Sequence, residues 1–182
     1  MDVTHALPRG APLTYDDLQA MPDDGHRYEL VDGVLIVTPA PVRLHQRAVA
    51  RLLALLMAAA ADEHEVLPAP FDYKISESTV LEPDLIVARK ADFGEKNLQH
   101  TPVLVIEVQS PSTRRIDLGT KRLAFEAAGV PFYWLVDPDE LSLTVLELVD
   151  GTYREAARVE GEGAYEASEP FFVRVVPADL VR

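Results

Sequence analysis

The sequence predicts an α/β fold in which a central mixed β-sheet is flanked by helices and carries additional β-hairpins. Three observations support this prediction. Asp-Gly pairs at 32–33 and 150–151 each separate two apolar runs, which is the strongest short-range signal for a hairpin. Residues 44–63 are rich in alanine and leucine at helical spacing. A helical segment also connects apolar runs at 103–109 and 132–136, and such a crossover makes the two strands parallel.

The N-terminal elements follow from their capping and turn residues. Residues 12–21 are expected to form a short helix, with Thr14 as its N-cap and Pro22 as its stop. The first hairpin is expected over residues 27–37, around the first Asp-Gly pair, and it ends at Pro39.

The middle of the chain is expected to hold the long helix and three strands. The helix, residues 44–63, is apolar over most of its circumference, so it should be substantially buried. Its apolar residues at helical spacing are Leu44, Ala48, Leu52, Leu55 and Ala59. The strands are expected at 65–75, 80–88 and 103–109, and the polar segment 90–101 is expected to be a loop.

The last third of the chain extends the sheet. A helix is expected from residue 113 to about 128, because Gly129 suits the position after a helix and Pro131 prevents its continuation. A short buried strand follows it. Residues 143–159 are expected to form the second hairpin, and residues 171–175 are expected to add a final strand.

The composition is that of one globular domain spanning residues 1–182, because hydrophobic residues make up 48% and charged residues 26%. The absence of cysteine excludes disulfides, thiolate nucleophiles and zinc–thiolate sites. Residues 1–10 lack the apolar centre of a signal peptide. The longest apolar stretch, 52–61, is about half as long as a membrane span. We therefore expect a soluble, cytoplasmic protein.

The formal net charge of −13 argues against strong electrostatic binding of nucleic acid, because released counterions supply much of that affinity. It does not exclude a phosphodiester substrate. Any basic surface must be local. The residues that best fit such a surface are Arg114, Arg115, Lys121 and Arg122, together with Arg43, Arg47 and Arg51.

Two acids occupy positions in apolar runs where core residues are expected. Asp84 lies in the run at residues 80–87, and Glu107 lies in the run at residues 102–110. Two carboxylates on adjacent buried strands repel each other unless they share a proton, contact a basic partner or bind a divalent cation. Oxygen ligands suit Mg²⁺ or Mn²⁺, which can activate water for hydrolysis. Alternatively, one acid lies at a strand end in solvent and the other pairs with an arginine.

Three further residues are candidates for the same site. Gln109 shares a strand face with Glu107. Lys121, in the following helix, would stabilise developing charge or orient a water, or it forms an ordinary surface ion pair with Asp117, four positions earlier. Strand alternation leaves two interpretations of Glu29, which either points into a site or lies on an exposed edge.

Other chemistries receive little support. His45, near the start of the long helix, is expected to be a structural hydrogen-bonding residue. The remaining histidines have no metal-ligand spacing, and they are His5, His26, His64 and His100. The sequence contains neither a glycine-rich phosphate loop nor a Gly-x-Ser-x-Gly elbow, which disfavours kinases, NTPases and serine hydrolases.

Four blocks of the sequence resemble a known family. Residues 105–121, VIEVQSPSTRRIDLGTK, resemble the signature of the Uma2 family, whose members are endonucleases of the restriction-endonuclease-like superfamily. Residues 28–33, 83–85 and 129–138 match the other blocks of that family in order. The resemblance covers roughly residues 13–160.

The resemblance implies a restriction-endonuclease-like core with its site at one end of the sheet. The superfamily pattern is Pro-Asp followed later by Asp or Glu, any residue, and Lys. By that pattern, Asp84 and Glu107 bind a divalent metal, and Gln109 stands in the lysine place. Lys121 resembles the family's relocated lysine, and Glu29 resembles its additional acid.

The resulting hypothesis is a Mg²⁺- or Mn²⁺-dependent endonuclease that hydrolyses phosphodiester bonds of nucleic acid, with DNA as the expected substrate. Arg114 and Arg115 are expected to contact flanking phosphates. By analogy with double-strand cutters of the superfamily, the chain is a candidate homodimer. Two alternatives stay open, namely a catalytically degenerate module that binds protein or nucleic acid and a metal hydrolase acting on a small phosphorylated molecule.

Overall fold

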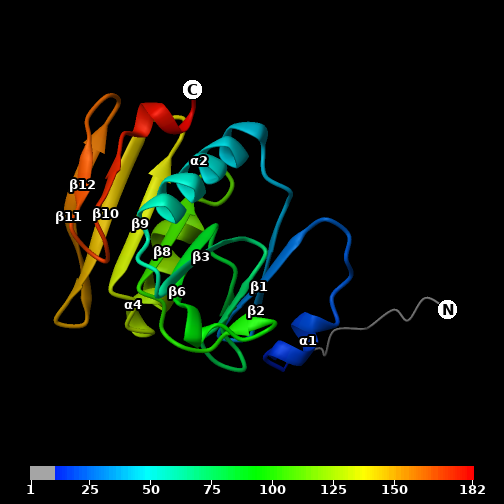
Figure 1. Ribbon diagram of the computed structural model, residues 1–182. Coiled ribbons are helices and arrows are strands. Elements are labelled where there is room, and N and C mark those ends of the chain that lie inside the picture. Colours follow the sequence, from blue (N-terminus) through cyan, green and yellow to red (C-terminus); the bar gives the residue numbers. More distant parts are fainter. Residues whose placement is uncertain (1–10) are drawn as a thin grey trace.

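The computed structural model describes residues 11–182. Residues 1–10, where no signal peptide was expected, lie outside this range, as does His5. Helix α2 (Arg43–Ala59) lies across one face of the larger sheet, and the smaller sheet and α1 (Tyr15–Gln19) lie to one side of it (Figure 1). In the described part of the chain, no helix is long and apolar enough to cross a membrane.

The larger sheet is mixed, as predicted. Its strand order within residues 11–182 is β11-β10-β9-β8-β6-β3. Strands β8 and β9 are parallel, whereas the other neighbours are antiparallel. The strands are β3 (His64–Pro68), β6 (Leu85–Arg89), β8 (Leu104–Val108), β9 (Phe132–Asp137), β10 (Ser142–Val149) and β11 (Thr152–Glu160).

The crossover between β8 and β9 is helical but is not one regular helix. It consists of a short α3 (Arg114–Ile116), a π-helical turn η2 (Asp117–Lys121) and α4 (Arg122–Ala127). Gly129 ends it with a φ of 75°, as the sequence predicted. The π-helical turn was not expected, and such turns are frequent at functional sites.

The smaller sheet has the strand order β2-β1-β5-β4-β7 within the described residues. The first hairpin is as predicted, and its turn residues Asp32 and Gly33 both have positive φ, which a two-residue turn of this type requires. Thr14 caps α1, also as predicted. The strands are β1 (Arg27–Val31), β2 (Val34–Thr38), β4 (Asp72–Lys74), β5 (Val80–Leu81) and β7 (Asn97–Leu98).

Apolar side chains cover both faces of the larger sheet. Leu52 and Leu56 of α2 pack with Trp134 in one cluster, which also includes residues near the C-terminus. Phe125 of α4 packs with Tyr133 in the other cluster. The long helix is shorter than expected, because α2 ends at Ala59. It is also buried over less of its circumference than expected, because Leu55 and Met57 are exposed on its solvent side.

Three other expectations need correction. The segment 80–88 is not one strand, because β5 and β6 belong to different sheets. The segment 65–75 is likewise divided between β3 and β4. The expected loop 90–101 contains a 3₁₀ turn, η1 (Lys90–Asp92), and β7. The final strand is β13 (Val173–Val175), which pairs with the unexpected β12 (Tyr165–Ala167), and η3 (Pro177–Leu180) follows it.

Candidate active site

Asp84 and Glu107 meet where the two sheets join. Leu85 of β6 pairs with Ile106 of β8, so Asp84 and Glu107 stand opposite each other one position further along these antiparallel strands. The chain passes from β5 to β6 through Glu82, Pro83 and Asp84, and proline lacks the N–H group that a continuous ladder would need. Asp84 is 3% exposed and Glu107 is 1% exposed.

Three donors hold the Asp84 carboxylate. Arg27 Nη1 lies 2.8 Å from Oδ1, and His45 Nε2 lies 3.0 Å from Oδ2. The backbone N–H of Val108 donates to Oδ2 at 2.8 Å. Burial alone would raise the pKa of Asp84, but the hydrogen bond from His45 and the charge of Arg27 hold that pKa well below its usual range. Asp84 is therefore ionised at neutral pH.

Lys121 joins the two sheets through carboxylates. Its Nζ lies 2.9 Å from Glu107 Oε1 in β8 and 2.9 Å from Glu29 Oε1 in β1. The side chain is 2% exposed, so the interpretation as a surface pair with Asp117 is wrong. Burial alone would lower the pKa of Lys121, but the two carboxylates raise it above its usual range, and Lys121 stays protonated.

Glu29 points into the site and does not lie on an exposed edge, because it is fully buried. Besides binding Lys121, its Oε1 accepts a hydrogen bond from the backbone N–H of Glu82 at 2.8 Å. Arg27 lies on the same face of β1, with its Nε 3.8 Å from Glu29 Oε2. Within residues 11–182, that Oε2 atom has no hydrogen-bond partner.

Asp117 is a second buried acid with free acceptors. It is 1% exposed, and neither carboxylate oxygen has a hydrogen-bond partner among the described residues. Burial raises the pKa of Asp117 to about 6, although Lys121 opposes that rise. Burial also raises the pKa of Glu107, again against the effect of Lys121. The cluster thus holds carboxyl groups with strongly different proton affinities.

Gln109 is buried and lies two positions after Glu107 in the sequence. Its backbone N–H donates to Val136 across β9 at 2.7 Å. Its side-chain Nε2 is a buried donor without a hydrogen-bond partner in residues 11–182. The N–H groups of the Gln109 side chain therefore remain unpaired among the described residues.

Two of the predicted basic residues form contacts within the protein. Arg114 forms an ion pair with Asp137 at the end of β9, whereas Arg115 is exposed. Arg47 donates to the carbonyl oxygen of Val181 at 2.7 Å, and thus holds the C-terminal segment against α2.

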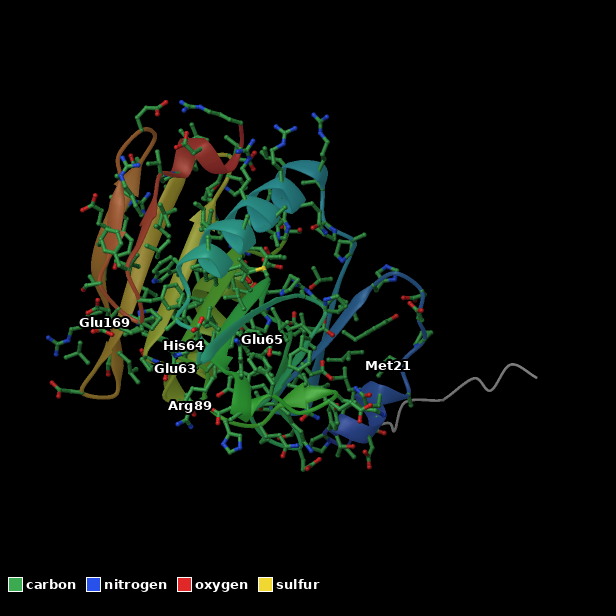
Figure 2. All side chains as sticks on the ribbon, in the orientation of Figure 1. Met21, Glu63, His64, Glu65, Arg89 and Glu169 are labelled. Carbon is green, nitrogen blue, oxygen red and sulfur yellow. The ribbon has the colours of Figure 1, made fainter. Side chains whose placement is uncertain are left out.

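Sequence reasoning did not assign Arg27 or Asp117 to the site, and it gave His45 only a structural role. Two signals were present. Arg27 and Glu29 are two positions apart in a strand and so share a face. His45 falls within the buried stripe of α2. By contrast, His64 stands opposite Arg89 in the backbone register of β3 and β6, at the end of β6 that is away from Asp84. Figure 2 labels His64 and Arg89.

A cavity of about 680 Å³ borders the site on the side of α1 and the start of α2. Arg27, His45 and Asp84 contribute to its lining, whereas Glu107 and Lys121 do not.

The side chains fit a divalent cation by donor type and charge. Four buried carboxylates face two permanent cations, Arg27 and Lys121, which leaves a formal excess of two negative charges. Carboxylate oxygens are the ligands that Mg²⁺ and Mn²⁺ prefer. In residues 11–182, no three His, Asp or Glu side chains converge as a ready-made metal cage. Lys121 and Arg27 instead neutralise part of the cluster. The carboxylates are Glu29, Asp84, Glu107 and Asp117.

The comparisons with known proteins agree with this fold. Residues 15–174 match the sequence profile of the Uma2 family, described as "Putative restriction endonuclease". The structure is similar to a crystal structure described as a "putative nuclease belonging to DUF820" from Anabaena variabilis ATCC 29413. The TM-score is 0.72 at 17% identity, covering 93% of this chain and 98% of that chain. Among curated proteins, none matches this chain.

Proposed function

Because the chain belongs to the Uma2 family, we propose that it is a Mg²⁺- or Mn²⁺-dependent endonuclease that hydrolyses phosphodiester bonds of DNA. The observation that carries this proposal is the buried cluster in which Lys121 bridges Glu29 and Glu107 beside Asp84. Buried ion pairs are often less favourable than an apolar replacement of the same shape. A cluster of such groups with shifted pKa values beside a cavity is typical of a catalytic site.

In this proposal, Asp84 and Glu107 hold the metal. When bound, the ion supplies Lewis-acid activation of water and neutralises charge that develops on the phosphate. A metal ligand must be deprotonated. The lowered pKa of Asp84 meets that requirement at neutral pH, whereas the raised pKa of Glu107 means that metal binding must displace a proton from this carboxyl group. Arg27 and His45 keep this carboxylate ionised and oriented.

Lys121 acts as a charged donor and not as a general base, because its raised pKa keeps it protonated. Its ammonium group can stabilise negative charge on the scissile phosphate or donate to the attacking water. Glu29 anchors Lys121 from the smaller sheet. Gln109 supplies a neutral amide donor at the edge of the cluster, where the superfamily pattern has lysine.

Arg114 and Arg115 are proposed to contact phosphates that flank the cut. Their helix, α3, follows β8 after the short segment 109–113, so both arginines are close in sequence to Glu107 and to Lys121. We propose that the protein is cytoplasmic. By analogy with other members of the superfamily, we also propose that it forms a homodimer.

A supercoiled-plasmid nicking assay tests the proposal. Wild-type protein should nick the plasmid with Mn²⁺ or Mg²⁺ and should fail in EDTA. Asp84→Asn should abolish nicking, whereas Asp62→Asn, which removes an exposed carboxylate, should not. Nicking by Asp84→Asn at the wild-type rate would refute the site assignment. A folded wild-type protein that never nicks would favour the binding-module alternative.

A further inference from the structure

The cavity beside Asp84 has the size of a small-molecule site and mostly apolar walls. Its volume of about 680 Å³ lies within the range of about 300–1,000 Å³ that is typical of ligand pockets. Leu18 and Met21 of the α1 region form part of one wall (Figure 2 labels Met21). Tyr28 and Val42 form part of another wall. These walls suit a flat apolar group.

The charge of the lining does not suit a phosphate backbone. Asp23, Asp72 and Glu82 line the cavity in addition to Asp84. The guanidinium of Arg27, on the same lining, is already paired with Asp84 at 2.8 Å. Proteins bind phosphates with free lysine and arginine side chains or with backbone N–H groups. Among the described residues, the lining holds no lysine and no arginine other than the paired Arg27, so it favours an uncharged part of a ligand.

The polar groups in the cavity match the edge of a nucleobase. Gln19 Nε2 donates to Asp72 Oδ2 at 3.1 Å, so an amide and a carboxylate stand side by side. Beyond this bond, the primary amide of Gln19 has a second N–H and a carbonyl oxygen, so that one donor and one acceptor stand together. Nucleobases that leave the stack are read by hydrogen bonds to their edge and by contact of their faces with apolar or aromatic walls.

From this arrangement we propose that the cavity binds one unpaired nucleobase of the substrate strand, next to the phosphate that is cut. The inference rests on the proposed nuclease function and adds the class of substrate. DNA with single-stranded, bulged or mismatched positions is then preferred, because a base in a regular duplex must first be unpaired and unstacked.

Fluorescence anisotropy with a labelled single-stranded oligonucleotide tests this inference, with Ca²⁺ in place of Mg²⁺ to separate binding from cleavage. A series of the same strand carries one abasic position, moved along its length. At one register, loss of the base should weaken binding by about tenfold, which is in the range of one stacked base. A fully paired duplex should bind more weakly than the single strand.

Two matched variants locate the effect. Val42→Trp places a large ring in the cavity at a position that is 64% exposed in the wild type. Met57→Trp makes the same kind of change on α2, at a 62% exposed position outside the cavity lining. Val42→Trp should remove the difference between intact and abasic strands, and Met57→Trp should keep it.

The outcomes separate this inference from the proposed function. If wild-type protein nicks plasmid in an Asp84-dependent manner but binds intact and abasic strands equally, the base-binding inference is overturned and the nuclease stands. A Val42→Trp variant that keeps the full difference also overturns the inference. If folded wild-type protein neither binds nor cleaves nucleic acid, both proposals are wrong.

Discussion

Replacement of Lys121 by methionine tests the buried cluster most directly. Methionine keeps the length and most of the volume of the side chain, so little cavity forms. The variant leaves Glu107 Oε1 without its bond to Lys121, and Glu29 Oε1 keeps only the N–H of Glu82. Removal of one partner from a buried ion pair costs about 3–5 kcal/mol, because the remaining charges stay buried.

We expect Lys121→Met to lower the free energy of unfolding by about 3–5 kcal/mol at pH 7. The loss should shrink at acidic pH, where the buried carboxylates take up protons and no longer need the lysine charge. Urea unfolding can be followed through the fluorescence of Trp134, which is the only tryptophan and is fully buried. Lys96→Met, at an exposed lysine, should stay within about 0.5 kcal/mol of wild type.

A divalent cation should restore part of the lost stability, because the orphaned carboxylates of the variant offer it oxygen ligands. Mn²⁺ should therefore raise the unfolding midpoint of Lys121→Met more than that of Lys96→Met. A Lys121→Met protein as stable as wild type at pH 7 would refute the argument. So would a loss of stability that stays the same from neutral to acidic pH.

Two other substitutions probe charge and backbone. Asp117→Asn should stabilise the protein by about 3 kcal/mol above pH 6, because a pKa of about 6 in the fold against 3.8 unfolded means that ionisation costs folding energy. This gain should fade as the pH falls from 6 to 3.8, and unfolding curves that show a pH-independent difference would contradict it. Gly33→Ala should destabilise the protein more than Gly151→Ala. Both glycines have a φ of 75°, but only at Gly33 would an added Cβ lie 2.4 Å from Cβ of Pro12. The midpoints of thermal unfolding of the two variants test this difference.

The hairpins were predictable because local chemistry alone determines them. Asp32 and Gly33 have φ values of 50° and 75°, and Asp150 and Gly151 have 52° and 75°. The same dipeptide thus forms the same turn in two different sheets. No long-range contact is needed for that choice, since the turn matches the twist of the strands that it joins.

The division of residues 80–88 was not predictable from the apolar pattern. Periodicity identifies a strand but does not say which sheet it joins. Pro83 is the physical cause, because it interrupts the ladder and lets β5 pair with β1 while β6 pairs with β8. As a consequence, Asp84 lies at the junction of the two sheets and not within a strand.

Three acids of the candidate site and Lys121 could be found from the sequence, but the partners of Asp84 and the role of Asp117 could not. An acidic residue within an apolar run can be recognised from the sequence alone. Arg27 reaches Asp84 across 57 positions of sequence and His45 across 39, so only the packing of β1 and α2 against β6 brings them together. The burial of Asp117 likewise depends on the π-helical turn, which no local pattern indicated.

Under the proposed function, glutamine at position 109, where the superfamily pattern that the sequence resembles has lysine, has a physical rationale in this cluster. Lys121 already provides the cation from η2, bonded to both Glu107 and Glu29. A lysine at position 109 would add a third permanent cation beside Arg27 and Lys121, and it would reduce the formal excess of negative charge from two to one. The attraction of the cluster for a divalent cation would then fall, because that attraction depends on the excess negative charge. A neutral amide at position 109 preserves the excess, so glutamine there and lysine at 121 together favour a metal site.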